Sequence, residues 1–488
     1  MKKESFSRWG IIFAGLGMAV GTGNLWRFPR IASQYGGGAF MLVWILFLFI
    51  WAIPLLIIEL SIGKKTRQGI IGSFSQMIGK NFAWMGTWIV FVTAAITFYY
   101  TVVTGWCIKY FFATCFQKLI EKRPEKLWNA FTSSYEPVIF HLLAIFIGCT
   151  VIYFGVTKGI ERANKLLIPS LFVLLLIAAV RALTLPGALN GLEFLFSPNL
   201  SQLGDLKIWI NALSQSAWSN GAGWGLMLTY AIYSRNKENP VLTSATLGFG
   251  NSMASLLAAI IVIPTVFSFY FGQSFAQDKV LNVMKQGNEG LTFIWIPELF
   301  SKIPSGSFFL ALFFLALCFA AFSSLISMLE LISRIFIDAG LSRKKAVTTV
   351  GISCFVLGFP SAISLGFFHN QDWVWSMGLV ISGAFFIFLV IKIGPKKFRK
   401  EIIKNSGQKM KLGKAFDILV TFVLPIQFIA LLAWWFWDSI KRNPDTWLNI
   451  FSSSTLGTVI FQWGIALAIF IIFNKIITKK LNVKNNVN

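Results

Sequence analysis

Charged residues are scarce in this sequence, and acidic residues are the scarcest of them. Only 13% of the 488 residues are charged, with 19 Asp and Glu residues against 43 Lys and Arg residues. Hydrophobic residues make up 56% of the chain, and its mean hydropathy is +0.69. This composition excludes an ordinary soluble globular protein of the same size, so we expect lipid to surround much of the chain.

Histidine and cysteine, which serve most often in catalysis and metal binding, are also few. The two histidines, His141 and His369, lie near the ends of apolar segments with no nucleophile or metal-ligand cluster beside them. The five cysteines show no paired spacing, which argues against a disulfide framework or a metal site. We therefore do not expect an enzyme, and no catalytic residue is assigned.

Basic residues give a formal net charge of +24, but they are scattered between apolar segments and do not gather on one soluble face. A nucleic-acid partner is therefore not expected, whereas contact with membrane lipid is. The densest basic segment, residues 395–414, is interpreted as a solvated loop that touches anionic lipid, with a partner-binding role as the alternative.

Long apolar runs are abundant. Runs of about 20 residues, enough to cross ~30 Å of hydrocarbon as a helix, recur from one end of the chain to the other. The predicted fold class is an all-α membrane protein with twelve transmembrane helices, at residues 9–33, 38–62, 84–113, 137–155, 166–185, 207–233, 241–271, 306–337, 346–367, 372–394, 415–438 and 455–477. The segments that a cytoplasmic amino terminus would place inside carry the larger share of Lys and Arg, which favours that orientation.

The first and sixth spans are interrupted by glycine-rich segments, GLGMAVGTGN (residues 15–24) and WSNGAGWG (residues 218–225). Glycine tolerates backbone angles that break a helix, and matched breaks in two halves of a chain point to a binding site near the middle of the membrane. Close helix packing on small residues is the alternative for either segment alone. At a break, one half-helix offers carbonyl oxygens to a cation and the next offers N–H groups to a carboxylate.

Three motifs, AVGTGNLWRFP (residues 19–29), YGGGAF (35–40) and IPLLIIELSIG (53–63), closely resemble the neurotransmitter:sodium symporter family. The resemblance continues through the paired tyrosines of the third span, KGIERANK (158–165), the break in the sixth span and CFAAFSSL (318–325). On these motifs the chain is identified as a bacterial, amino-acid-transporting member.

The resemblance implies a fold of two inverted five-helix repeats with broken helices 1 and 6, plus two peripheral helices. The first repeat would cover residues 1–185 and the second residues 186–395, while residues 396–488 would hold the basic inner loop and spans 11 and 12. Sodium ions at two sites are the implied cofactors, and a small amino acid is the implied partner.

The resemblance also implies the ligands of both sodium sites. The first site would be formed by the substrate carboxylate with Ala19, Asn24, Ser219 and Asn251. The second would be formed by the carbonyls of Gly17, Val20 and Ala320 with the hydroxyls of Ser323 and Ser324. Without the motif, these serines would be expected to bond a carbonyl one turn earlier in their own helix.

The implied substrate site lies at the two breaks. The substrate carboxylate is expected at the N–H groups of Gly21 and Gly23 and at the hydroxyl of Tyr100. Relatives that carry monoamines resemble one another in having an acidic residue at the position of Gly21, so glycine there implies an amino acid. The full set comprises Met18, Ala19, Gly21, Gly23, Ile96, Tyr100, Trp218, Ser219, Gly221, Trp224, Ser324 and Met328.

Apolar and aromatic side chains prevail in that set and no charge is present, which favours a neutral hydrophobic or aromatic amino acid. Met18, Trp218 and Trp224 depart from the residues of some relatives. The two indoles would shrink the pocket to fit alanine, or Gly221 would make room for an aromatic side chain, and the sequence leaves both alternatives open.

A gate is implied on each side of the site. Arg27 and Asp372, the latter expected at the start of the tenth span, match the outer gate, and Tyr233 and Asp338 match parts of the inner gate. The basic and aromatic residues that other members carry on the amino-terminal tail have no clear counterpart around residues 2–6.

Two further acids lie in predicted spans. Glu59 resembles the carboxylate that caps the broken sixth helix. Glu330 lies seven residues after Ser323, on nearly the same helix face, and is interpreted either as a functional carboxylate or as a hydrogen-bonded structural acid.

Chloride is a further question, because chloride-dependent members use neutral groups near the first sodium site where many bacterial members have a carboxylate. The matching residues here are all neutral: Gln215, Ser219, Asn251 and Ser255. The hypothesis is therefore chloride-stimulated transport, although Trp44 replaces the expected tyrosine and argues against it.

The predicted function is sodium-coupled symport of a neutral amino acid by alternating access. The alternative is a non-transporting amino-acid sensor of the same fold, because the same residues would serve it. Short termini, a short loop between spans 3 and 4, and richness in Lys, Ile and Asn favour the inner membrane of a bacterium.

Overall fold

Helix is the only regular structure among the residues that the computed structural model describes, which are 5–116, 123–273, 276–285, 287–302, 304–403 and 412–481. Within these ranges, nine helical segments are long and apolar enough to cross a membrane. The bent pair α25 (Leu456–Ile472) and α26 (Asn474–Lys480), with an angle of 59° between its helices, adds a tenth if it counts as one span. The prediction of an all-helical chain is therefore confirmed for the described residues.

The nine long segments are α4 (Gly38–Phe47) with η1 (Leu48–Ala52) and α5 (Ile53–Thr66), η2 (Lys80–Phe82) with α7 (Ala83–Cys115), α10 (Glu136–Tyr153), η3 (Val156–Glu161) with α11 (Arg162–Leu183), α15 (Pro240–Phe269), α19 (Gly306–Asp338), α20 (Arg343–Ile363), α21 (Leu365–Ile393), and α23 (Lys414–Ile418) with η8 (Leu419–Val423) and α24 (Leu424–Arg442).

The shorter elements are α1 (Arg8–Ala19), α2 (Thr22–Leu25), α3 (Arg27–Gln34), α6 (Ile70–Ile78), α9 (Pro124–Thr132), α12 (Ala188–Phe196), η4 (Leu200–Gly204), α13 (Leu206–Ser219), α14 (Leu226–Ala231), α16 (Ala276–Met284), α17 (Gly287–Glu289), η5 (Gly290–Trp295), α18 (Ile296–Phe300), α22 (Pro395–Lys397) and η6 (Phe398–Ile403).

Both glycine-rich segments interrupt a helix, as the sequence predicts. The α1 helix ends at Ala19, the next residue is extended, and α2 restarts after Gly21. The α13 helix ends at Ser219, and α14 restarts after a stretch in which Gly221, Gly223 and Gly225 have φ values of +63°, +88° and +78°. Side chains other than glycine rarely adopt those angles, so the glycines themselves make the second break.

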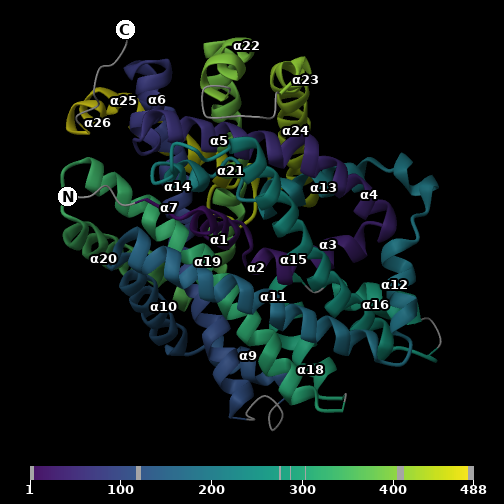
Figure 1. Ribbon diagram of the computed structural model, residues 1–488. Coiled ribbons are helices and arrows are strands. Elements are labelled where there is room, and N and C mark those ends of the chain that lie inside the picture. The colour runs from purple at the N-terminus through teal and green to yellow at the C-terminus, as the bar shows by residue number, and fades with distance from the viewer. Residues whose placement is uncertain are drawn as a thin grey trace.

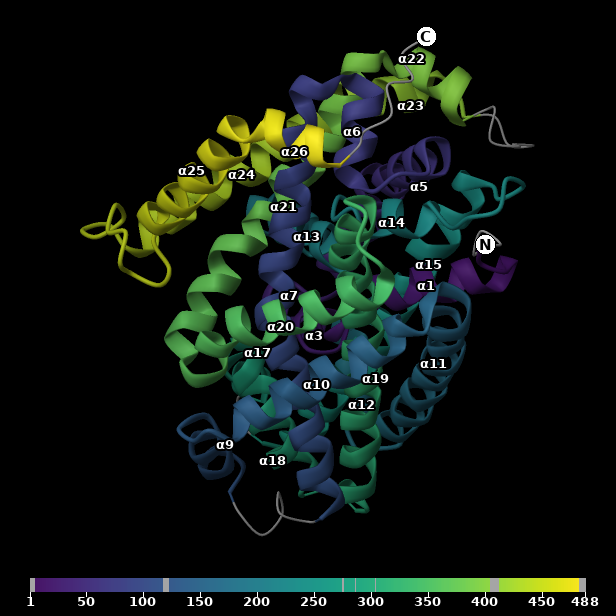
Figure 2. The same cartoon turned by 90° about the vertical axis from the view of Figure 1, so that its left-hand side faces the viewer.

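The interrupted helices lie at the centre of the bundle, where Figure 1 shows α1, α2 and α3 surrounded by longer helices. The α1 helix packs against α11, α15 and α19, while α13 packs against α4 and α14 against α5. In both views α22 and α23 lie at one end of the molecule and α9 and α18 at the other (Figures 1 and 2). The two breaks therefore lie between the ends, away from bulk solvent.

The last helices are peripheral. Figure 2 shows α24, α25 and α26 along one flank of the bundle. In the most apolar window of the α23–α24 segment 28% of residues are buried, compared with 78% in the segment that ends with α7. Apolar side chains left exposed on such a flank are suited to contact with lipid.

Two predicted helix starts are wrong by seven residues or more. The segment predicted as the fifth span begins at Val156 and not at residue 166, because the polar KGIERANK stretch is itself helical and buries Glu161 against Ser7 and Lys165. The α21 helix begins at Leu365 and not at residue 372, because the Ser364 side chain caps it by accepting from the Phe367 N–H group. Asp372 consequently lies two turns inside α21. Part of the basic segment 395–414 lies outside the described residues.

Candidate functional site

A cavity of about 580 Å³ extends from the end of the bundle near α17 to the two helix breaks. All of the predicted substrate residues line it, together with residues of α3, α17, α21 and α24 nearer its mouth. The lining residues at its base are Met18, Ala19, Gly21, Gly23, Ile96, Tyr100, Trp218, Ser219, Gly221, Trp224, Ser324 and Met328. The structure thus brings residues from four distant helices to one place.

The polar part of this base is formed by the start of α2. The Gly21 N–H group donates to Asn24 Oδ1 at 3.0 Å, and the Thr22 N–H group donates to the Tyr100 hydroxyl at 3.3 Å. A Cβ atom on Gly21 would lie 2.9 Å from Ser324 Oγ and 3.2 Å from the Tyr100 hydroxyl. No larger residue fits at position 21 without displacing the hydroxyl groups that surround it.

The apolar wall is formed mainly by two indole rings. Trp218 and Trp224 meet edge to face with their ring centroids 5.6 Å apart. Across from them, Met18 Cε lies 3.4 Å from the place where a Cβ on Gly221 would stand. Gly221 therefore faces Met18 directly, and a sulfur-containing side chain occupies part of the room that a glycine leaves.

The predicted ligands of the first sodium site converge behind the cavity, at the end of α13. Asn24 Nδ2 donates to Ser219 Oγ at 3.0 Å and to Asn251 Oδ1 at 2.8 Å. Asn251 Oδ1 also lies 3.0 Å from the carbonyl oxygens of Ala19 and Ser219. Two acceptor oxygens at that distance with no proton between them repel each other, and a cation would relieve the repulsion.

Turning the Asn251 amide around does not remove the conflict. Its nitrogen would then donate to the two carbonyl groups, but it would face Asn24 Nδ2 at 2.8 Å, while its oxygen would face Asn220 Oδ1 at 3.1 Å. In either orientation one end of the Asn251 amide meets a group of its own kind, whereas the oxygens of Ala19, Ser219 and Asn251 as they stand fit a hard cation such as sodium. Ala19, Asn24, Ser219 and Asn251 would hold such an ion.

The predicted ligands of the second sodium site also converge, between α1 and α19. Ser323 Oγ lies 3.0 Å from the Ala320 carbonyl oxygen and 3.4 Å from the Val20 carbonyl oxygen. Ser324 Oγ lies 3.2 Å from the Gly17 carbonyl oxygen and 3.3 Å from that of Val20. The last carbonyl groups of a helix have no N–H partner within it, so the oxygens of Gly17 and Val20, at the end of α1, are available to an ion.

The neutral residues proposed for chloride adjoin the first cluster. Ser255 Oγ accepts from Asn24 Nδ2 at 2.8 Å, so it belongs to the same network as Ser219 and Asn251. Gln215 is 1% exposed, and its Oε1 has no hydrogen-bond partner in the described structure. Trp44 packs against Phe28, with ring centroids 4.5 Å apart.

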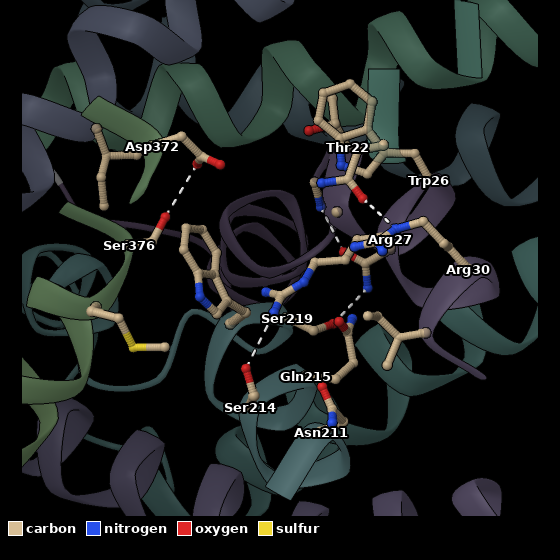
Figure 3. A pocket seen from close by; sticks show the side chains of 18 of the residues that line it. Thr22, Trp26, Arg27, Arg30, Asn211, Ser214, Gln215, Ser219, Asp372 and Ser376 are labelled. Carbon is tan, nitrogen blue, oxygen red and sulfur yellow. Dashed lines mark hydrogen bonds between the residues drawn. The ribbon is translucent and has the colours of Figure 1, made fainter. Parts of the chain in front are cut away.

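The two residues predicted for the outer gate stand apart in this structure, as Figure 3 shows. Arg27 Nη2 donates to Ser214 Oγ at 3.1 Å, and its guanidinium group lies 5.3 Å from the centre of the Trp218 ring. Asp372 accepts from the hydroxyl groups of Tyr99 and Ser376 at 3.0 and 3.1 Å. Among the described ion pairs none joins Arg27 to Asp372, and the cavity passes between them to the mouth. Sequence reasoning assigned no role to Ser214, which lies in no quoted motif, or to Tyr99, the neighbour of Tyr100 in the tyrosine pair.

A second acid reaches the same mouth from α17. Glu289 lines the cavity, and burial raises the pKa of its carboxyl group. The nearby Arg30 and His369 oppose that rise while Asp372 adds to it. Arg30 also donates from Nε to Asn288 Oδ1 at 2.9 Å, which ties α17 to α3.

The opposite end of the bundle is closed by a network of charged and aromatic side chains. Glu330 accepts from both terminal nitrogens of Arg343, at 2.8 and 2.9 Å, and from the Tyr233 hydroxyl at 2.9 Å. Asp338 pairs with Arg334 at 2.7 Å and accepts from the Gly69 N–H group at 2.9 Å. Glu330 is thus paired and hydrogen-bonded, and both of its interpretations, a functional carboxylate or a structural acid, remain predictions.

The amino-terminal tail joins this closure through Phe6. Its N–H group donates to the Tyr233 carbonyl at 3.0 Å, and its carbonyl accepts from Arg235 Nε at 3.0 Å. Its ring is 1% exposed and packs edge-on against Tyr230 and Tyr233. The tail thus contributes the apolar Phe6 to this closure, where other members carry basic and aromatic tail residues without a clear counterpart in this sequence. Residue 2 lies outside the described residues.

Glu59 occupies the position that the resemblance implies. Its carboxylate accepts from the N–H groups of Gly223 at 2.6 Å and Leu228 at 3.2 Å. These groups have no helical partner because the chain is unwound there, so the carboxylate stabilises the second break.

Comparisons with known proteins agree with this geometry. The chain matches the sodium:neurotransmitter symporter family over residues 3–136 and 133–482. It is 31% identical to the uncharacterized sodium-dependent transporter YhdH of Bacillus subtilis over 447 residues, which covers 87% of this chain and 95% of that protein. It is also 31% identical to the uncharacterized sodium-dependent transporter MJ1319 of Methanocaldococcus jannaschii, over 88% of this chain and 90% of that protein.

A solved structure is similar as well. The crystal structure of MhsT in complex with L-phenylalanine superimposes with a TM-score of 0.77 at 30% sequence identity, and covers 89% of this chain and 99% of that chain.

Proposed function

The chain belongs to the sodium:neurotransmitter symporter family, and from that membership we propose that it carries a neutral, hydrophobic or aromatic amino acid across a membrane together with sodium ions. The family and its relatives are transporters, so the chain is a transporter and not an enzyme. Its apolar helices make it an integral membrane protein. The observation that carries the proposal is the cavity whose base is built from both helix breaks.

The proposed architecture has twelve spans in two inverted repeats of five, followed by two peripheral helices. The nine long apolar segments, the bent pair α25–α26 and the two interrupted helices together support that number. The proposed boundaries are residues 1–185, 186–395 and 396–488. We propose a cytoplasmic amino terminus, because the segments on that side would carry the larger share of Lys and Arg. The proposed location in the inner membrane of a bacterium rests on the short loop between spans 3 and 4 and the richness in Lys, Ile and Asn.

The substrate class rests on two features of the cavity. Gly21 leaves no room for an acidic side chain, so a carboxylate at the start of α2 has to come from the ligand. The wall formed by Trp218, Trp224, Met18 and Met328 offers no charge to a ligand side chain. A ligand with a carboxylate at one end and an apolar group at the other suits both features. MhsT is known in complex with L-phenylalanine, which supports an aromatic substrate.

Sodium ions are proposed at both oxygen clusters, each within reach of the end of α1. The first ion would be held by Ala19, Asn24, Ser219 and Asn251, and completed by the substrate carboxylate. The second would be held by Gly17, Val20, Ala320, Ser323 and Ser324. An ion at the first site places positive charge against the substrate carboxylate, so each favours the binding of the other.

Chloride is proposed to stimulate transport. The neutral cluster of Gln215, Ser219, Asn251 and Ser255 provides amide and hydroxyl donors and no carboxylate of its own. An anion there would offset the charge of the first sodium ion in a region from which water is excluded. The proposal rests on the amide and hydroxyl donors of this cluster. Trp44, which replaces the tyrosine expected from the resemblance, does not support it.

The transport cycle proposed from this structure begins with the substrate cavity open toward α17 and closed toward Phe6. Substrate and sodium would bind at the breaks, and Arg27 would leave Ser214 and pair with Asp372 above them. The Tyr233, Glu330 and Asp338 network would then open on the other side. Ligand binding drives this change only to the extent that substrate and sodium bind more tightly to the conformation with the outer gate closed than to the open one.

The experiment that tests the proposal is a competition screen followed by uptake. All twenty amino acids compete against a bound radiolabelled amino-acid pool on the purified full chain, once in sodium and once in potassium. The best competitor is then offered to liposomes that contain the protein and an inward sodium gradient. Sodium-dependent competition with uphill uptake supports symport and names the substrate.

Two other outcomes have distinct meanings. If no amino acid competes in a sodium-dependent way, the proposed substrate class is wrong. If a competitor binds in sodium but is not taken up against its gradient, the chain acts as a sensor with the same binding site.

A further inference from the structure

Asn220 is a buried amide beside the first oxygen cluster that is neither a predicted ligand nor part of the cavity lining. It directly follows the end of α13 and is 1% exposed. Its Nδ2 donates to the Ser216 carbonyl at 3.1 Å, and its Oδ1 accepts from Asn251 Nδ2 at 3.1 Å. Both ends of this side chain therefore have a partner, one on its own helix and one on α15.

The first of these bonds fixes which way the Asn220 amide points. The Ser216 carbonyl can only accept, so it selects the nitrogen end of Asn220. The oxygen end must then face Asn251. Because Asn220 presents an acceptor there, Asn251 has to present its nitrogen, and its own oxygen points the opposite way.

The Asn251 oxygen therefore points toward the place proposed for the sodium ion. Asn251 Oδ1 lies 3.0 Å from the carbonyl oxygens of Ala19 and Ser219 and 2.8 Å from Asn24 Nδ2. Without an ion this orientation costs energy, because three oxygens meet with a single amide donor among them. A free amide would reduce that cost by turning around, and it would then present N–H groups where a cation has to bind.

We propose that Asn220 is a positioning residue for the first sodium site. It holds the Asn251 amide with its oxygen toward Ala19 and Ser219, so that an arriving sodium ion meets a preformed set of oxygens. The inference rests on the sodium site proposed above. Groups that orient the ligands of a metal ion typically change its affinity by about 10- to 100-fold when they are removed.

Three substitutions separate orientation from packing. Asn220→Leu keeps much of the volume but offers no acceptor to Asn251. Asn220→Asp keeps an acceptor oxygen toward Asn251 while losing the donor to Ser216. Ser252→Ala, next to Asn251 on α15 but without a bond to the oxygen cluster, is the matched control.

The measurement is equilibrium binding of ²²Na⁺ to the full chain in detergent, with no amino acid present, together with the melting temperature in potassium. We expect Asn220→Leu to raise the half-saturating sodium concentration of one class of sites about tenfold. We expect Asn220→Asp and Ser252→Ala to stay within about threefold of the original protein. The melting temperature in potassium reports folding without the ion.

The outcomes of the sodium-binding measurement distinguish the role of Asn220 from the existence of the sodium site. Unchanged sodium binding in Asn220→Leu, or an equal loss in Asn220→Asp, overturns the role of Asn220 and leaves the sodium site standing. No saturable binding of ²²Na⁺ by the original protein overturns the sodium site itself. If Asn220→Leu has a lower melting temperature than the original protein in potassium, Asn220→Ala is used in its place. When Asn251 is already replaced by Ala, neither Asn220→Leu nor Asn220→Ala should weaken sodium binding further.

Discussion

The two oxygen clusters at the end of α1 differ in what supplies their oxygens. The first is built mostly from side-chain groups, above all the amides of Asn24 and Asn251. The second takes its oxygens mostly from backbone carbonyl groups, with two serine hydroxyls in addition. A backbone ligand is fixed by the fold, whereas an amide has to be oriented by neighbours such as Asn220. We therefore expect the first site to be the more sensitive to substitution and to be linked directly to the substrate.

The largest effect is expected from placing a carboxylate where the substrate's own should bind. In Gly21→Asp the new side chain would crowd Ser324 Oγ and the Tyr100 hydroxyl, so amino-acid uptake should fall to background. Sodium binding should persist, because the new carboxylate lies beside both clusters. Gly204→Asp, at an exposed glycine with open space around it, is the control and should transport normally. Uptake by Gly21→Asp at the original rate would show that the substrate carboxylate binds elsewhere.

Removing one amide from the first cluster should have the next largest effect. Asn251→Ala deletes a proposed oxygen ligand, removes one acceptor of Asn24 Nδ2, and leaves Asn220 Oδ1 without its donor in a buried place. The sodium concentration that half-saturates amino-acid binding should rise about 100-fold. A sodium titration of substrate binding measures this change. A rise of less than threefold would mean that Asn251 is not a ligand.

Removing one hydroxyl from the second cluster should cost less. Ser323→Ala leaves three carbonyl oxygens and Ser324 in place, so the half-saturating sodium concentration should rise about tenfold, or ~1.4 kcal/mol. Ser382→Ala removes a hydroxyl that is equally buried and bonded to its own helix, outside both clusters, and serves as the control. If Ser323→Ala is as damaging as Asn251→Ala, the proposed contrast between the two sites does not hold.

The smallest effect is expected from the anion. Uptake by the original protein should fall about threefold when gluconate replaces chloride, because an unscreened sodium ion in a dry site is less stable. Ser255→Glu introduces a fixed negative charge beside Asn24, whose Nδ2 lies 2.8 Å from the present Ser255 Oγ, and should make uptake independent of chloride. Ser255→Ala separates the added charge from the lost hydroxyl. Equal uptake by the original protein in both salts at several pH values would refute the chloride proposal.

The sequence predicted the helices well and their ends less well, for a physical reason. Hydropathy locates a span because lipid contact requires apolar residues over its full length. It does not locate the start of α21, where the polar residues around Asp372 continue the helix and line the cavity. Nor does it locate the start of η3, where Glu161 is buried but bonded to Ser7 and Lys165.

For the site, a short motif predicted more than composition could. The family motif implied the backbone ligands proposed at Gly17 and Val20, and the glycine-rich break agrees with them because unwinding exposes carbonyl groups. Partners such as Asn220 for Asn251, or Ser214 for Arg27, come from segments far apart in the chain or depend on whether a gate is open. The spacing of residues along the chain does not predict such contacts, so they are found only in the folded structure.

The burial of Phe6 also has a practical consequence for biophysical work on this chain. A fluorophore or affinity tag attached within a few residues of Phe6 would pull on a ring that packs against Tyr230 and Tyr233 and on two backbone hydrogen bonds. Such a label would shift the equilibrium that it is meant to report. Exposed positions near the end of α26, such as Lys480, lie far along the chain from that contact and are the better attachment points.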